Sequence, residues 1–300
     1  MNDEHVALVA LLRTRPEGLN WRKLTDEVLQ YGSAVAVWDY YNPLQLIPSA
    51  EADAALEAAR ADLEAWGRDG LRFVGVLDKE FPQRLLDIWE TPPFLFAQGH
   101  LGGEDDLGLS VVGSRKASAF GLDMASGIAT YLAEQRLTVI SGLAAGIDAA
   151  AHTAAIAASG RTVAFIATGV RKQYPAENRD LQAQIMDDGL VLSQFWPDAP
   201  PRKQHFLMRN ALMSGYGVAT IVVEAGEMSG ARAQARMAVE HGRPVILTSL
   251  VVERNHWART LAERPNVWVV SGVRDIGPIV DEILSGPHRV DEALRLLTVP

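Results

Sequence analysis

Short apolar runs recur from residue 107 onward, roughly 25 residues apart, and helix-compatible segments fill most of the gaps, as successive βαβ units require. Each run is continuously apolar rather than alternating, which is typical of strands covered by helices on both faces. The runs are residues 109–112, 138–140, 162–167, 190–192, 219–223, 244–247 and 267–270. The pattern predicts an α/β fold with a Rossmann-like, doubly wound and mostly parallel sheet over residues 107–300.

Helical patterns precede this region. Residues 5–12 are apolar on one side, Asn20 can cap a helix over residues 21–31, and Gly32 stands where a C-terminal glycine is expected. A further helix is indicated over residues 51–66, which are rich in alanine and leucine. We therefore expect a small helical domain over residues 1–68. Short apolar pieces and paired prolines then predict a connector over residues 69–106.

Composition narrows the class of protein. The 300 residues carry a net charge of −9, which argues against a surface that coats nucleic acid but allows a local basic groove. The absence of cysteine excludes disulfides, thiolate zinc sites and a cysteine nucleophile. The sequence shows neither a secretory signal pattern nor an apolar stretch of about 18 residues, so we expect a cytoplasmic protein without membrane contact.

Candidate binding residues follow the predicted strands, because ligands of such sheets lie at the carboxyl ends of the strands. The first strand is followed by Gly113, Ser114, Arg115 and Lys116. A glycine lets the backbone approach a ligand, the serine offers a hydroxyl, and arginine can bind a phosphate through two nitrogens. The same four residues are also compatible with an ordinary solvated turn.

A second candidate loop follows the next strand, with Ser141 and Gly142 at its start and Gly146 at its end. Its glycines can expose backbone N–H groups to an anion at a helix N-terminus, although their spacing is not that of the dinucleotide fingerprint. Asp148 and His152 are four residues apart on one helix face and could bind a metal, but no third ligand is near. We expect Asp148 to cap the helix and His152 to pack or to face a ligand, with no metal and no other cofactor.

Two later segments add candidates. Lys203, Phe206, Arg209 and Asn210 interleave cations with an aromatic ring, a combination that suits single-stranded nucleic acid, whereas a solvated loop with Phe206 in the core is the alternative. After the fifth strand, Glu224 could bind a ribose hydroxyl, act as a base or accept structural hydrogen bonds. The candidates that open the next helix are Ser229 and Gly230.

Together these segments resemble one family, the DNA-processing protein A family, also called DprA or Smf. The matching segments are VVGSRKAS at 111–118, VISGLAAGIDAAAH at 139–152, YPAEN at 174–178, FLMRN at 206–210 and VVEAGEMSGA at 222–231. The resemblance extends to about Arg243 and implies a SAM-like helix-hairpin-helix domain at the N-terminus. It further implies a homodimeric, non-enzymatic protein that binds single-stranded DNA and helps to load a RecA-type recombinase in natural transformation.

The resemblance also assigns residues. It places Gly113, Ser114 and Arg115 in one phosphate-binding loop and Ser141, Gly142 and Gly146 in a second. By the same resemblance, the segment that binds the DNA strand contains Lys203, Phe206, Arg209 and Asn210. The chain departs from the family pattern at several positions. Ala211 replaces an arginine, Leu207 a proline and Gln194 a glutamate, residues 248–300 diverge, and we expect no winged-helix domain.

An alternative function is that of a sensor, such as a defence-related one, which binds a nucleotide or nucleotide-derived signal in the same Rossmann-like cleft. There the loops would hold one phosphate, and Glu224 with Arg115 would face the ribose. A nucleotide hydrolase is disfavoured, because the chain has no Pro-Gly-Gly-x-Gly-Thr loop. A scaffold without a ligand is a third alternative, disfavoured by the intact glycine-rich loops.

Overall fold

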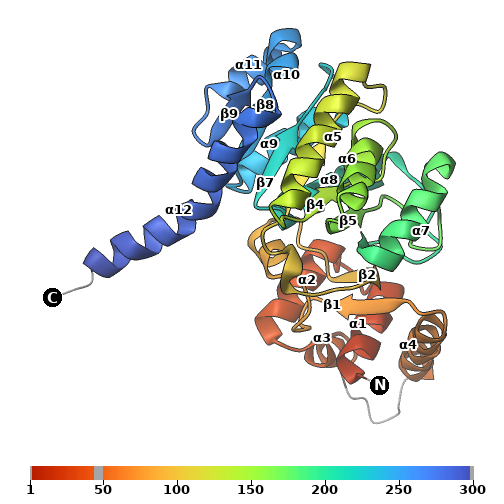
Figure 1. Ribbon diagram of the computed structural model, residues 1–300. Helices are drawn as coiled ribbons and strands as arrows, with labels where there is room; N and C mark the ends of the chain where they lie inside the picture. The colour runs from red at the N-terminus through yellow and green to blue at the C-terminus, as the bar shows by residue number, and fades with distance from the viewer. Residues whose placement is uncertain (1, 44–49, 298–300) are drawn as a thin grey trace.

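The computed structural model describes residues 2–43 and 50–297. Its N-terminal region is helical, as predicted (Figure 1). The helices are α1 (Asp3–Thr14), α2 (Trp21–Tyr31), α3 (Ala34–Tyr41) and α4 (Ala50–Arg68). Polar side chains cap three of them, because Asn2, Asn20 and Ser33 each accept a hydrogen bond from a backbone N–H of the first turn. Gly32 ends α2 with a left-handed φ of 65°, which confirms the predicted glycine position.

All the predicted apolar runs form strands of one nine-stranded sheet in the order β1-β2-β6-β5-β4-β3-β7-β8-β9. The strands are β1 (Arg72–Gly75), β2 (Phe94–Gly99), β3 (Leu109–Val112), β4 (Val139–Ser141), β5 (Thr162–Phe165), β6 (Leu190–Ser193), β7 (Ala219–Val222), β8 (Val245–Thr248) and β9 (Val267–Val270). Strands β3 to β9 pair in parallel, which confirms the Rossmann-like fold. The predicted connector extends the same sheet, since β1 pairs with β2 and β2 with β6 in antiparallel register.

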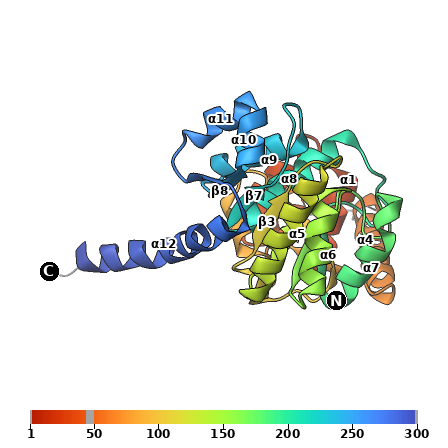
Figure 2. The ribbon, with the colours of Figure 1, turned by 45° about the horizontal axis from the view of Figure 1, so that its top comes forward.

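Helices cover both faces of the sheet (Figures 1 and 2). The helices after β3 are α5 (Ala119–Glu134), α6 (Ile147–Ala157), α7 (Arg179–Asp188), α8 (Lys203–Tyr216), α9 (Gly230–Glu240), α10 (Ser249–Arg254), α11 (His256–Ala262) and α12 (Ile276–Leu297). The 3₁₀ turns are Gln83–Asp87, Gly103–Asp105, Ala176–Asn178 and Val273–Asp275. Side chains of β3 alternate between two cores: Val111 packs with α5 and α6, and Val112 with the core of α8 and α9. None of the helices within residues 2–43 and 50–297 is long and apolar enough to cross a bilayer.

The strand order creates a switch point beside β3. The chain proceeds from β3 through β4 and β5 to β6 on one side, and then crosses to β7 on the other side of β3. The loops after β3 and β7 therefore diverge to opposite faces and leave a crevice at the carboxyl ends of these strands. The sheet thus places the ligand crevice where the glycine-rich sequences occur.

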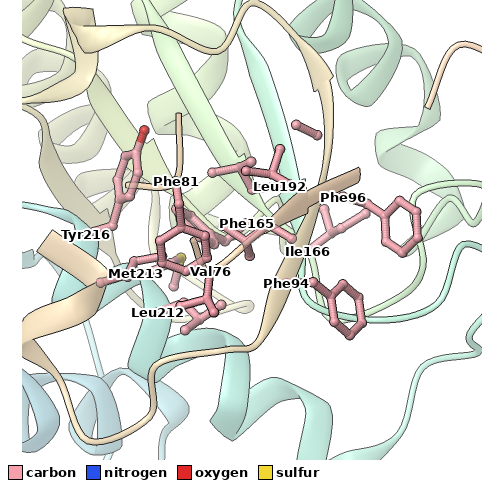
Figure 3. Close-up of a cluster of buried hydrophobic side chains, with 14 of the residues drawn as sticks. Val76, Phe81, Phe94, Phe96, Phe165, Ile166, Leu192, Leu212, Met213 and Tyr216 are labelled. Atoms are coloured by element: carbon pink, nitrogen blue, oxygen red, sulfur yellow. The ribbon is translucent and has the colours of Figure 1, made fainter. Parts of the chain in front are cut away.

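An aromatic cluster joins the helical region to the sheet. Figure 3 shows Phe94 and Phe96 of β2 near Phe165 of β5. Phe94 contacts Trp21 of α2 edge-on at 5.5 Å between ring centroids, and Phe96 contacts Trp66 of α4 at 5.0 Å. These rings belong to one continuous buried core, so the orientation of the N-terminal helices is set by packing on the sheet.

Replacing Phe165 by alanine tests this core. Phe165 is 1% exposed, so Phe165→Ala removes a ring from a packed site and should lower the free energy of unfolding by about 3–5 kcal/mol. Urea unfolding followed by circular dichroism measures the change. The same substitution at Phe120, which is 58% exposed, serves as control and should cost less than about 0.5 kcal/mol. Equal effects of the two substitutions would contradict the assigned core.

Candidate functional site

A cleft of about 260 Å³ lies at the switch point of the sheet. Its walls come from four parts of the chain, namely the loop after β3, the segment from the loop after β4 to the start of α6, helix α8 and the start of α9. The lining includes Gly113, Ser114, Arg115, Asp148, Phe206, Arg209, Asn210, Ser229, Gly230 and Gln234. A neighbouring pocket of about 50 Å³ shares Arg115, Phe206 and Arg209 and adds Gly142 and Tyr174. The structure therefore gathers most of the predicted site residues at one place.

A row of contacting side chains, Arg115, Phe206 and Tyr174, forms the rim of the cleft. The exposed Arg115 holds its guanidinium 4.7 Å from the centre of the Phe206 ring, within the range of a cation–π contact. Phe206 in turn lies 5.8 Å from the ring of Tyr174. The ring of Phe206 is half-buried, which differs from the interpretation that places it in the core. Sequence reasoning named Tyr174 only within the matching segment at 174–178, so its place on the rim was missed.

The two glycine-rich loops contact each other. Gly146 has a left-handed φ of 79°, and a Cβ at this position would lie 2.3 Å from the carbonyl oxygen of Ser114. The next residue, Ile147, donates its N–H to that same oxygen at 3.2 Å. Only glycine allows this approach, so the loop after β4 supports the loop that carries Arg115.

Arg209 anchors the floor of the cleft. Its side chain is buried, and Nη1 donates to the carbonyl oxygens of Gly142 at 2.5 Å and Phe165 at 3.2 Å, at the ends of β4 and β5. Burial lowers the pKa of Arg209 to about 10, although the carboxylate of Asp148, 3.9 Å away, opposes the shift. Its Nε has no partner within the described part of the chain. Arg209 thus holds the loops together, whereas the sequence interpretation expected it to contact the bound DNA.

Asp148 stabilises the loop that precedes its helix. The residue that caps α6 is Gly146, so the prediction that Asp148 caps the helix was wrong. The Asp148 carboxylate instead accepts hydrogen bonds from the backbone N–H groups of Gly142 at 3.2 Å and Ala144 at 3.4 Å. Burial raises the pKa of this carboxyl group, whereas Arg209 and the N–H donors lower it.

Two predicted residues lie away from the cleft. His152 is fully buried, and its Nδ1 lies 2.7 Å from the hydroxyl of Thr162, so it packs in the core rather than facing a ligand. Burial lowers its pKa to about 3. Ser141 is also buried and donates its hydroxyl to the carbonyl of Val111 at 2.6 Å. Both residues connect neighbouring parts of the sheet domain.

Glu224 is a structural acceptor. Its carboxylate accepts from the backbone N–H of Ser118 at 3.0 Å and from the Ser118 hydroxyl at 2.7 Å, at the start of α5. Of the three sequence interpretations for Glu224, the structure matches this one. The hydroxyl of Ser229 caps α9, and the carbonyl of Gly230 accepts from the side-chain amide of Asn210, which connects α9 to α8.

Gln234 is a cleft residue that sequence reasoning missed. It is 1% exposed, it lines the cleft from α9, and its Nε2 finds no hydrogen-bond partner among the residues described. The signal was its position four residues after Gly230, which places it on the same face of the helix. Lys116 and Lys203 are exposed and line neither pocket, so they add charge at the periphery. The described His, Asp and Glu residues form no group of three that could hold a metal.

The crevice, the paired glycine-rich loops and the cation–aromatic rim define a Rossmann-like protein with a cleft at the switch point of its sheet. A family model described as DNA recombination-mediator protein A matches residues 72–272, which is more than half of the chain. The chain therefore belongs to this family. The match continues past Arg243, where the resemblance read from the sequence ended.

Curated relatives agree with this assignment. The chain is 40% identical over 170 residues to the DNA processing protein DprA of Streptococcus pneumoniae, covering 57% of this chain and 60% of the relative. It is 34% identical over 184 residues to that of Bacillus subtilis, covering 61% and 62% of the two chains. The matches thus span about three fifths of the length of these relatives.

Solved structures extend the likeness. The X-ray structure of DNA processing protein A from Streptococcus pneumoniae superposes with a TM-score of 0.74 at 27% identity, covering 92% of this chain and 97% of that chain. A structure of DNA processing protein A from Helicobacter pylori, reported for its single-stranded DNA binding mode, gives a TM-score of 0.62 at 22% identity, covering 72% and 97%. At that identity the second likeness concerns the fold.

The buried His152 predicts acid sensitivity. Its folded-state pKa of about 3 lies below the ordinary value of 6.5, so the unfolded chain takes up a proton that the folded chain excludes. The free energy of unfolding should therefore fall as the pH drops below about 6.5, by about 2 kcal/mol between pH 7 and pH 5 from this group. Denaturant unfolding at several pH values measures the slope. His152→Gln should remove this part of the slope, whereas His256→Gln, at an exposed ring, should preserve it.

Proposed function

We propose that this protein binds single-stranded DNA across the loops after β3 and β4 and acts in DNA processing. The observation that carries the proposal is the row of contacting side chains, Arg115, Phe206 and Tyr174, beside the cleft. Single-stranded nucleic acid is bound by cations that meet phosphates and by rings that stack on bases. Both groups lie here on one rim, and the family to which the chain belongs supports the same ligand.

The loops supply the remaining phosphate contacts. The cleft is lined by Gly113 and Ser114 after β3, and by Ser229 and Gly230 at the N-terminus of α9, where a helix favours negative charge. Arg209 adds a buried positive charge beneath them. The exposed Lys116 and Lys203 extend the positive charge around the site. A local basic site of this kind is compatible with the net charge of −9 of the whole chain.

The proposed role is binding rather than catalysis. The carboxylate that lines the cleft, Asp148, and the candidate base Glu224 both accept hydrogen bonds from backbone N–H groups, so neither is free to act as a general base. As partners we propose a RecA-type recombinase and a second copy of this chain. The family description as a recombination mediator supports the recombinase. Sedimentation equilibrium would test the homodimer.

One observation favours the alternative, a sensor of a nucleotide or nucleotide-derived signal. The amide nitrogen of Gln234, which has no hydrogen-bond partner among the described residues, lies in the cleft and can donate a hydrogen bond to the base of a single bound nucleotide. The earlier idea that Glu224 faces a ribose finds no support, because its carboxylate is held by Ser118. Thermal-shift measurements with mononucleotides test this alternative, since a ligand that binds only the folded state raises the melting temperature.

Arg115→Ala should weaken DNA binding. The substitution removes the exposed cation of the rim, so the affinity for oligothymidylate should fall about tenfold and the slope of log K against log salt should shrink by about 1. Fluorescence anisotropy of a labelled oligonucleotide, titrated at several salt concentrations, measures both. The matched control is Arg136→Ala, an exposed arginine just before β4 at the other end of the strands, which should change neither. Absence of wild-type binding even at low salt would overturn the proposed function.

Phe206→Leu separates stacking from charge. Leucine keeps an apolar side chain beneath Arg115 but has no aromatic face, so binding should weaken by about 1–3 kcal/mol with the salt slope unchanged. The same anisotropy titration measures the change. Tyr31→Leu, which alters an exposed ring on α2, is the control. A fall in the salt slope for Phe206→Leu would show that the ring acts only by positioning Arg115.

A further inference from the structure

A second cavity, of about 190 Å³, lies on the other side of α8 from the cleft. We call it the tryptophan cavity. It is lined by Trp21 and Arg22 of α2, by Trp89 and the segment that follows it, by Gln194 after β6 and by Met208 of α8. None of these residues lines the cleft described above. Since α8 contributes Phe206 to the cleft and Met208 to the tryptophan cavity, the two sites share this helix as a wall.

Trp89 forms a preorganised aromatic platform at this cavity. Its side chain is 71% exposed, and the guanidinium of Arg22 lies 4.0 Å from its ring centre. Arg22 is itself held, because Nε donates to Asp26 at 2.9 Å and Nη1 donates to the carbonyl of Trp89. Arg22 covers one face of the indole, so the high exposure leaves the other face open to a planar ligand.

Gln194 adds a hydrogen-bonding group to the cavity wall. It is 4% exposed, and its Nε2 has no hydrogen-bond partner in the described ranges 2–43 and 50–297. A buried amide donor without a partner is unfavourable unless a ligand supplies an acceptor. An amide, unlike a carboxylate, can donate a hydrogen bond and does not repel a phosphate.

We propose that the tryptophan cavity binds a base of the same DNA strand that occupies the cleft. This inference rests on the proposed function, because the cleft supplies the strand. Trp89 stacks on the base, and Gln194 donates to a carbonyl or ring-nitrogen acceptor on its edge. Between the two sites the strand crosses the exposed side of α8, where Lys203 can meet a phosphate and Leu207 is 48% exposed.

The charges around the cavity are compatible with a nucleic acid. Arg22 is the cation closest to the platform. The one carboxylate of the lining, Glu90, lies 2.9 Å from the Nε2 of His241 and so has a partner of its own. A planar, uncharged base with its own donors and acceptors therefore fits a lining that combines indole rings, prolines and a methionine with the Arg22 guanidinium and the Gln194 amide.

A length series of oligothymidylates tests the proposal on the full chain. A short oligomer of about 4 nucleotides occupies only the cleft, whereas one of about 20 nucleotides reaches both sites. Trp89→Ala should weaken binding of the long oligomer about tenfold and leave the short one unchanged. Arg115→Ala should weaken both. Tyr40→Ala, at an exposed ring of α3, is the matched control and should change neither.

Two further variants make the result specific to this cavity. Gln194→Leu replaces the unpartnered amide by an apolar side chain, so it should preserve or raise the melting temperature and yet weaken binding of the long oligomer. In Trp89→Phe the ring is retained, so binding of the long oligomer should persist. The quenching of tryptophan fluorescence by that oligomer should be smaller than in the wild type.

Each outcome decides between the two proposals. Wild-type binding of the long oligomer by Trp89→Ala, with Arg115→Ala still defective, would overturn the tryptophan cavity and leave the proposed function intact. Full tryptophan quenching in Trp89→Phe would overturn it as well, since the base would then lie elsewhere. Failure of the wild-type protein to bind oligomers of any length would overturn the proposed function itself.

Discussion

The buried guanidinium of Arg209 is the contact on which the candidate site depends. Through one nitrogen it joins α8 to the ends of β4 and β5, where Gly142 and Phe165 offer their carbonyl oxygens. Burying a charge is costly unless polar groups surround it, and Asp148 supplies the opposite charge 3.9 Å away. The same carboxylate accepts backbone N–H groups of the loop after β4. One cation and one anion thus fix a helix, two strand ends and a loop.

This anchor explains the glycine at position 142 and the position of the rim. A Cβ on Gly142 would lie 1.4 Å from Nη1 of Arg209, so no other residue allows the guanidinium to reach the carbonyl. With α8 fixed in this way, Phe206 lies one turn before Arg209 and points to the rim, where Arg115 and Tyr174 contact it. The side chains that would meet a strand are therefore held in place before any ligand binds, which reduces the entropy lost on binding.

The fold could be predicted from the sequence to a large extent, and the site only in part. Strands buried on both faces leave continuous apolar runs, and caps such as Asn20 depend on local sequence, so both were confirmed. The positions of the glycine-rich loops were also predicted, because the close contact between them depends on the backbone at Gly146. The roles of Arg209 and Asp148 depend on tertiary burial, which no local pattern records. Gln234 and Trp89 became evident only when distant segments met around a cavity.

The two departures from the family pattern on α8, at positions 207 and 211, leave the contacts of the rim intact. The arginine that the pattern places at position 211 is an alanine here. Ala211 is 1% exposed and lines neither the cleft nor its neighbouring pocket, so the loss removes no cation from the rim. Leu207 stands where the family pattern has a proline. It is an exposed residue inside a continuous helix, where an apolar side chain is compatible with a DNA strand that crosses the helix. Both substitutions leave Arg115 and Phe206 in contact, and the arrangement proposed to hold the DNA is preserved.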